Sequence, residues 1–232
     1  MYANELCCYL FKNPSGNSPT ELNRSPEMQK KCRVIINLFT AFMPFLAWSS
    51  MFRGVYGGVL SSRGLASLKY FTVLSNLLEG FASLIWLSAT LFGRRKNHRA
   101  EVLKFIACMS VFLTFLTVVV FLGPLFGYAG MFSGANLWLH LIIPLAAIGE
   151  CMVFVRESFS VRESLYTIVP VLVYAAGYLG NILVNGRGNI VTGKNDFYGF
   201  VTWGIPIGIC IFALICLVVF LVSLLLRKIC SR

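Results

Sequence analysis

The sequence predicts an all-α, polytopic membrane protein with six transmembrane helices. Of its 232 residues, 57% are hydrophobic and 12% are charged, and the mean hydropathy is +0.76. These values lie far from those of soluble globular domains. Six apolar runs of about 18 residues or more, the length that crosses a bilayer as a helix, follow one another along the chain. Little sequence remains for a soluble domain.

The apolar runs divide the chain into three parts. Residues 1–33 are polar, are interrupted by proline and glycine, and lack the early apolar core of a signal peptide, so we expect a cytosolic tail. A six-helix transmembrane domain is expected over residues 34–226, and a short basic cytosolic C-terminus over residues 227–232. The expected spans are Val34–Phe52, Tyr70–Phe92, Phe105–Phe126, Ser133–Phe154, Leu165–Asn185 and Tyr198–Leu226.

The distribution of Lys and Arg predicts the orientation of the helices. All twenty basic residues lie outside the expected spans, and fifteen of them share one side if the N-terminus is cytosolic. Because basic residues accumulate in cytoplasmic loops, both termini are predicted to be cytosolic. Topology and anionic lipid headgroups then account for the net charge of +11, and we expect no nucleic-acid partner.

The cysteines and histidines do not indicate a metal site. The eight cysteines include no C-x-x-C pair, and they fall either in the spans or on the reducing side of the membrane. The two histidines, His98 and His140, show no metal-ligand spacing. We expect neither a metal nor an organic cofactor.

Three ionisable side chains are expected inside the spans, namely Glu79, His140 and Glu150. An ionisable group in hydrocarbon costs several kcal/mol unless it faces a polar interior, so each is a candidate functional residue. Glu79 and Glu150 are open to two interpretations, as structural acids kept neutral by burial or as members of a proton relay.

The second and fourth spans each carry a polar face. Thr72, Ser75 and Asn76 share a face with Glu79, since they are separated by helical spacings. Asn136 and His140 form a comparable stripe with Glu150. Both spans enter the membrane from the outside, so Thr72 and His140 are expected at similar depth, within about two turns of the outer interface. Asn181, near the outer end of the fifth span, is a further candidate for this site.

A hydroxyl that faces an imidazole in a water-poor cavity forms the smallest nucleophile and base pair. A threonine hydroxyl is unreactive until a base removes its proton, and burial favours the neutral imidazole that can act as that base. Asn76 and Asn136 are equal candidates for donating to an oxyanion, and Ser75 is the next candidate nucleophile. The alternatives for Thr72 and His140 are helix packing and an interhelical hydrogen bond.

Two short motifs resemble a known family. The segment KYFTVLSNLL over residues 69–78, followed by NLWLH over residues 136–140 and then Glu150, resembles the androgen-induced-gene family of six-span proteins and its bacterial relatives. Animal members are transmembrane threonine hydrolases that cleave fatty-acid esters of hydroxy fatty acids with an intramembrane Thr and His. The resemblance implies that Thr72 is the nucleophile, that His140 is the base, and that the protein resides in a bacterial cell membrane.

The expected function is therefore hydrolysis of a lipid ester at a pocket near the outer face. Lys69 is a candidate for attracting a lipid carboxylate or phosphate, and its alternative role is a snorkelling anchor. Two other functions stay open. One is a proton-coupled small-molecule transporter that uses Glu79, His140 and Glu150, and the other is an acyltransferase that uses the same Thr72 and His140 site.

Overall fold

The computed structural model describes residues 26–53, 63–92, 97–189 and 193–230. Within these ranges, six helices are long and apolar enough to cross a membrane, which confirms the predicted all-α polytopic membrane protein. Most of the expected N-terminal tail lies outside the described residues. The six membrane-crossing segments are Glu27–Ser50, Phe71–Leu91, His98–Phe126, Ala135–Phe154, Val161–Asn185 and Ile205–Cys230.

Two helices begin earlier than hydropathy predicts. Helix α3 (Pro26–Ser50) starts inside the expected tail, and α6 (His98–Thr117) starts before the expected Phe105. The added turns are rich in Glu, Gln, Lys, Arg and Ala, which favour helix but lower the local hydropathy. The prediction that all basic residues lie outside the spans is therefore wrong. The prediction that the spans contain only three ionisable groups is wrong for the same reason.

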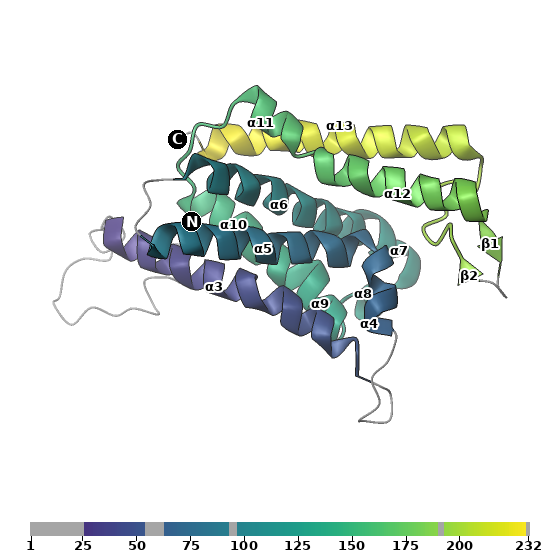
Figure 1. The fold of residues 1–232 in the computed structure, drawn as a ribbon, viewed down its shortest axis with the longest axis horizontal. Helices are drawn as coiled ribbons and strands as arrows, with labels where there is room; N and C mark the ends of the chain where they lie inside the picture. Colours follow the sequence, from purple (N-terminus) through teal and green to yellow (C-terminus); the bar gives the residue numbers. More distant parts are fainter. Residues whose placement is uncertain (1–25, 54–62, 93–96, 190–192, 231–232) are drawn as a thin grey trace. The chain divides into compact units, whose positions relative to one another are not determined.

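The chain forms two compact units, one ending at Glu157 and the other beginning at Ser158. In the first unit, α3 packs on α5 (Phe71–Leu91), α5 on α6, α6 on α10 (Ile143–Phe154) and α10 on α3, which closes a four-helix bundle. Figure 1 shows α3, α5 and α6 side by side. The short helices α4 (Arg63–Ala66) and η1 (Ser67–Lys69) lead into α5.

The third and fourth spans are not uniform α-helices. A π-helix, η2 (Val118–Leu122), joins α6 to α7 (Gly123–Phe126), and a second, η3 (Trp138–Ile142), joins α9 (Ala135–Leu137) to α10. Helix α8 (Tyr128–Met131) lies between the two spans.

Both π-helices end two residues before a proline, at Pro124 and Pro144. Proline has no N–H to donate, and its ring collides with the carbonyl four residues earlier, so a wider turn relieves the clash. Before Pro144, that carbonyl belongs to His140.

The second unit contains the last two spans. Its helices are α11 (Val161–Tyr166), which begins with a capping box from Ser160 and Glu163, α12 (Val169–Asn185), and α13 (Ile205–Cys230). Helices α11 and α12 both pack on α13. A two-residue antiparallel pair, β1 (Gly188–Asn189) with β2 (Gly193–Lys194), follows α12.

The last helix differs from its expected range at both ends. It starts at Ile205 rather than Tyr198, and it continues through Arg227 to Cys230, inside the expected C-terminal segment. Residues before it form turns at Gly199 and Gly204, whose positive φ angles of 73° and 107° are incompatible with helix. Tyr178 secures this turn region, because its hydroxyl donates to Asp196 Oδ1 at 2.5 Å within an aromatic cluster.

Candidate functional site

The expected nucleophile and base lie on two elements that pack together. Thr72 is the second residue of α5, and His140 is in the middle of η3. Their chain neighbours Val73 and Leu139 are buried in one hydrophobic cluster, which holds the start of α5 against η3. The structure therefore places both residues at the same end of the bundle.

Asn76 connects these two elements directly. Its Nδ2 donates to the carbonyl of Thr72 at 2.7 Å and to the carbonyl of Leu139 at 2.9 Å. The side chain is fully buried, and its hydrogen bond to Leu139 is shielded from water. Both amide hydrogens are used in this way, and Asn76 has none left to donate to an oxyanion.

The His140 imidazole is oriented by a backbone carbonyl. Its Nδ1 lies 2.9 Å from the carbonyl oxygen of Met131 in α8, and the residue is 7% exposed. Because a carbonyl oxygen only accepts, this contact assigns a hydrogen to Nδ1. In the neutral form of the ring, Nε2 then carries the lone pair, which is the arrangement that a general base requires.

Thr72 and His140 are not hydrogen bonded to each other within the described residues. The Thr72 side chain is half-buried, and its hydroxyl makes no hydrogen bond there. Catalytic hydrogen bonds are often long in unliganded enzymes and shorten when substrate binds. The two residues thus lie on adjoining elements without forming a hydrogen-bonded pair within the described residues.

The remaining polar candidates occupy different positions around this pair. Ser75 is buried, and its hydroxyl donates to the Thr72 carbonyl at 3.0 Å and lies 2.9 Å from Thr114 Oγ1. Asn136 is half-buried, and its amide has only a long contact of 3.5 Å with the Gly130 carbonyl.

Two further candidates lie at the periphery of the described structure. Lys69 is exposed directly before α5, with its Nζ 5.2 Å from the centre of the Tyr70 ring. Asn181 belongs to the second unit, where its Oδ1 accepts from Asn185 Nδ2 at 2.8 Å.

Glu79 and Glu150 belong to a different cluster, which lies farther along the same four-helix bundle from Thr72 and His140. Both are ion-paired with Lys104 of α6, which contacts Glu79 Oε1 and lies 2.9 Å from Glu150 Oε2. Lys104 also donates to Ser83 Oγ at 2.8 Å. All three charged side chains are almost completely buried.

Arg33 extends this cluster toward the N-terminus of α3. Its guanidinium donates to both oxygens of Glu101, at 2.8 and 2.5 Å, and to Glu150 Oε1 at 3.0 Å. The group also stacks over the Trp86 ring at 4.3 Å, and Trp86 Nε1 donates to Glu101 Oε1 at 2.8 Å. We call the five charged residues Arg33, Glu79, Glu101, Lys104 and Glu150 the ion core.

Hydropathy places three members of the ion core, Arg33, Glu101 and Lys104, in loops and therefore does not identify them. A signal for the first was present in the helical spacing of Arg33, Asn37 and Thr40 on one face of α3. Asn37 Nδ2 indeed donates to Glu150 Oε1 at 2.8 Å, and Thr40 Oγ1 lies 2.8 Å from Ser83 Oγ.

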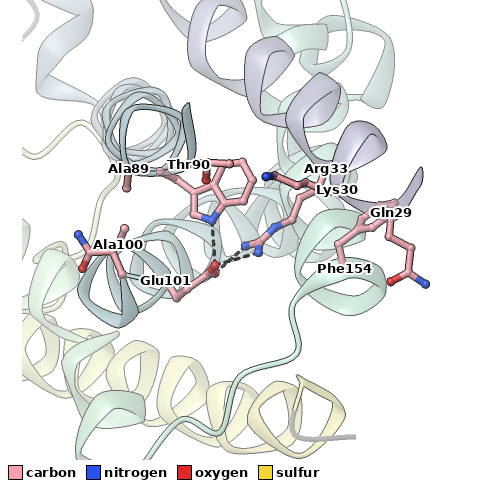
Figure 2. A pocket seen from close by; sticks show the side chains of 10 residues that line it. Gln29, Lys30, Arg33, Ala89, Thr90, Ala100, Glu101 and Phe154 are labelled. Carbon is pink, nitrogen blue, oxygen red and sulfur yellow. Dashed lines mark hydrogen bonds and ion pairs between the residues drawn. The ribbon is translucent and has the colours of Figure 1, made fainter. Parts of the chain in front are cut away.

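A cavity of about 340 Å³ adjoins the ion core. Figure 2 shows the Arg33 and Glu101 side chains joined at its wall. Trp86, Lys30 and Phe154 also line it, so the cavity has both charged and apolar walls. It lies at the end of α3 and α6 where both helices begin, far along α5 from Thr72.

No family model matches the chain, and no curated protein or solved structure matches it. The resemblance carried by residues 69–78 and 136–140 therefore stays a prediction.

Proposed function

We propose that the protein is an intramembrane hydrolase of lipid esters, with Thr72 as the nucleophile and His140 as the general base. The observation that carries the proposal is the pair of hydrogen bonds from the Asn76 amide to the backbone carbonyls of Thr72 and Leu139. These bonds link the helical turn that carries the Thr72 hydroxyl to the helical turn that carries the His140 imidazole. The π-helix around His140 adds support, since such segments are frequent at functional sites.

In the proposed reaction, Thr72 Oγ1 attacks the acyl carbonyl while His140 Nε2 takes its proton. The ester C–O bond breaks, the acyl group stays on Thr72, and the proton passes from His140 to the departing alcohol. Water then attacks the acyl-threonine, again losing its proton to His140, and the fatty acid leaves as Thr72 regains its hydrogen. The Met131 carbonyl acts as a positioning group that holds the ring with Nε2 available.

The N-terminus of α5 is a suitable place for the oxyanion. No side chain caps this end, and the backbone N–H of Thr72 makes no hydrogen bond within the described residues. Free N–H groups at the start of a helix attract negative charge. Asn136, whose amide contact is long, is the better side-chain candidate for a second donor, because the hydrogens of Asn76 are both occupied.

The proposed substrate is a long-chain ester already dissolved in the bilayer. Lys69, exposed next to the start of α5, would attract a carboxylate or phosphate at the outer interface. The motif resemblance suggests fatty-acid esters of hydroxy fatty acids and a bacterial cell membrane. An acyltransferase would use the same first step and would differ in replacing water by a second alcohol.

The transporter alternative has less support. His140 bonds to Met131, whereas Glu79 and Glu150 meet at Lys104. Glu150 follows His140 by ten residues, which corresponds to about 15 Å of helix. A relay through all three residues would need intermediates across this distance.

The proposal is tested by ester hydrolysis with purified protein in lipid nanodiscs. Release of fatty acid from a fatty-acid ester of a hydroxy fatty acid should fall at least 100-fold in Thr72→Ala and in His140→Ala, since both groups take part in the chemical step. Thr90→Ala is the matched control, because Thr90 is half-buried near the other end of the same helix. Equal turnover in Thr72→Ala and Thr90→Ala would contradict the proposal. Product analysis with an added alcohol would separate hydrolysis from acyl transfer.

A further inference from the structure

We propose that the ion core is a proton-binding site, in which Glu79 holds one exchangeable proton in the folded protein. This inference does not depend on the reaction proposed for Thr72 and His140. The first evidence for the proton is the balance of charges in the ion core, within the four-helix unit. The ion core contains three carboxylates and only two cations. A buried, uncompensated charge costs several kcal/mol.

The hydrogen-bond pattern shows the same deficit. Glu79 Oε2 and Asn37 Oδ1 are buried and have no hydrogen-bond partner among the residues that the structure describes. Both atoms are acceptors, so the core lacks donors as well as positive charge. A single proton on Glu79 corrects both shortages at once, because it neutralises the excess carboxylate and turns one orphan acceptor into a donor.

Glu79 is the member that the other groups stabilise least as an anion. Glu101 accepts two bonds from Arg33 and one from Trp86. Glu150 faces two cations, Arg33 and Lys104. Among the cations of the described segments, Glu79 contacts Lys104 alone, and its exposure is 0%.

The geometry favours a proton over a metal ion. No group of three or more His, Cys, Asp or Glu residues in the described ranges is arranged to hold a metal. The Lys104 ammonium already occupies the position between Glu79 and Glu150. The cavity beside Arg33 and Glu101 borders the ion core, and protons would exchange with Glu79 from this side.

Glu79 contacts Ser83 of α5 and Lys104 of α6 directly, and Lys104 also pairs with Glu150 of α10. The other helices reach Glu79 through these groups: Arg33 and Asn37 of α3 bind Glu150, Arg33 also binds Glu101 of α6, and Lys30 lines the cavity beside Arg33. Two further titratable residues of this unit, His98 and Glu157, pair with each other outside the ion core. His98 Nδ1 lies 3.7 Å from Glu157 Oε2, and the His98 side chain is half exposed. Within the described residues of this unit, Glu79 accepts two hydrogen bonds, from Lys104 and Ser83, whereas the less buried Glu101 accepts three.

A bound proton makes stability depend on pH with a defined sign. The unfolded chain releases the Glu79 proton at neutral pH, whereas the folded protein keeps it. Unfolding therefore releases a proton, and stability falls as pH rises. For one proton, the ratio of folded to unfolded protein changes by up to about tenfold per pH unit.

The test is infrared spectroscopy of the full chain in maltoside micelles, which contain no carbonyl group. The wild type at neutral pH should show the C=O stretch of a protonated carboxylic acid, and this band should shift in D2O. Glu79→Gln should lack the band and should lose the corresponding pH dependence of unfolding. Glu157→Gln, which removes an acid outside the ion core, should keep both.

Three outcomes would overturn the proposal. In the first, the wild type lacks the band and the protein is more stable in sodium chloride than in choline chloride, which would assign a metal cation to the position beside Glu79. Another is absence of the band without any salt effect, which would assign the missing donors to buried water. The third is a band that persists in Glu79→Gln. The wild-type band and its shift in D2O need no variant, so a Glu79→Gln protein that fails to fold does not remove the test.

Discussion

The side-chain amide of Asn76 lies 2.9 Å from the backbone carbonyl of Leu139 and thereby ties α5 to the π-helix that carries His140. The same amide holds the Thr72 carbonyl at 2.7 Å. One buried side chain thus controls the spacing of the two turns that carry the proposed nucleophile and base.

Asn76→Asp should weaken both folding and turnover. The aspartate has nearly the same shape but cannot donate to either carbonyl, and it places a negative group beside two acceptors. We expect a loss of about 1–3 kcal/mol in the free energy of unfolding. Equilibrium unfolding in detergent measures it. Asn185→Asp, on an exposed side chain at the end of α12, should change the stability little, and equal effects at both positions would contradict the bridging role.

Pro144→Ala should reduce turnover without unfolding the protein. Alanine restores the N–H that a regular helix needs at this position, so the π-helix should convert to α-helix. Removal of its extra residue turns the helix before Pro144 by about 100°, which carries His140 away from α5. Turnover should fall at least tenfold while the thermal midpoint stays or rises. Pro170→Ala is the control, because Pro170 is in the first turn of α12, where proline displaces no helical bond.

Gly80→Ala should destabilise the bundle through a steric clash between α3 and α5. A methyl group at this position would lie 2.8 Å from the Phe45 ring and 3.3 Å from the Ala41 carbonyl. Overpacking of this kind costs about 1–3 kcal/mol. Gly149→Ala is the matched control on α10, where no described atom outside the local helix backbone lies within 4 Å of the added methyl, and it should be neutral or stabilising. Similar losses in both variants would contradict close packing at Gly80.

Lys104→Met should be among the most damaging single substitutions in the chain. It leaves Glu79 and Glu150 in the bundle without their shared cation, and removal of one partner of a buried ion pair costs about 3–5 kcal/mol. Lys31→Met, on an exposed position of α3, should stay within about 0.5 kcal/mol of the wild type. Denaturant unfolding followed by Trp fluorescence compares the two. A stable, well-folded Lys104→Met protein would show that the ion core is dispensable for folding.

Hydropathy predicted the six helices well because the bilayer imposes their length and composition. It also placed Glu79 and Glu150 inside the bundle, since a polar face cannot point at lipid. It failed for Arg33 and Lys104, because a charge lowers a hydropathy window whether it faces water or a buried carboxylate. Only the partner decides the burial of such a residue, and for Lys104 the partners are 25 and 46 positions away in sequence.

The site near Thr72 was predictable in part. Helical spacing placed Thr72, Ser75 and Asn76 on one face, and the structure brings Asn76 to the element of His140. The π-helix was not predictable from hydropathy, because an inserted residue leaves the composition of the span unchanged. Its one signal was Pro144, four residues after His140.

The most direct test of the proposed chemistry is covalent trapping. Protein in nanodiscs would be treated with a long-chain fluorophosphonate, digested, and mapped by mass spectrometry. The proposal predicts an adduct on Thr72 that disappears in Thr72→Ala and is strongly reduced in His140→Ala. An adduct on Ser75, or equal labelling of the wild type and His140→Ala, would contradict it.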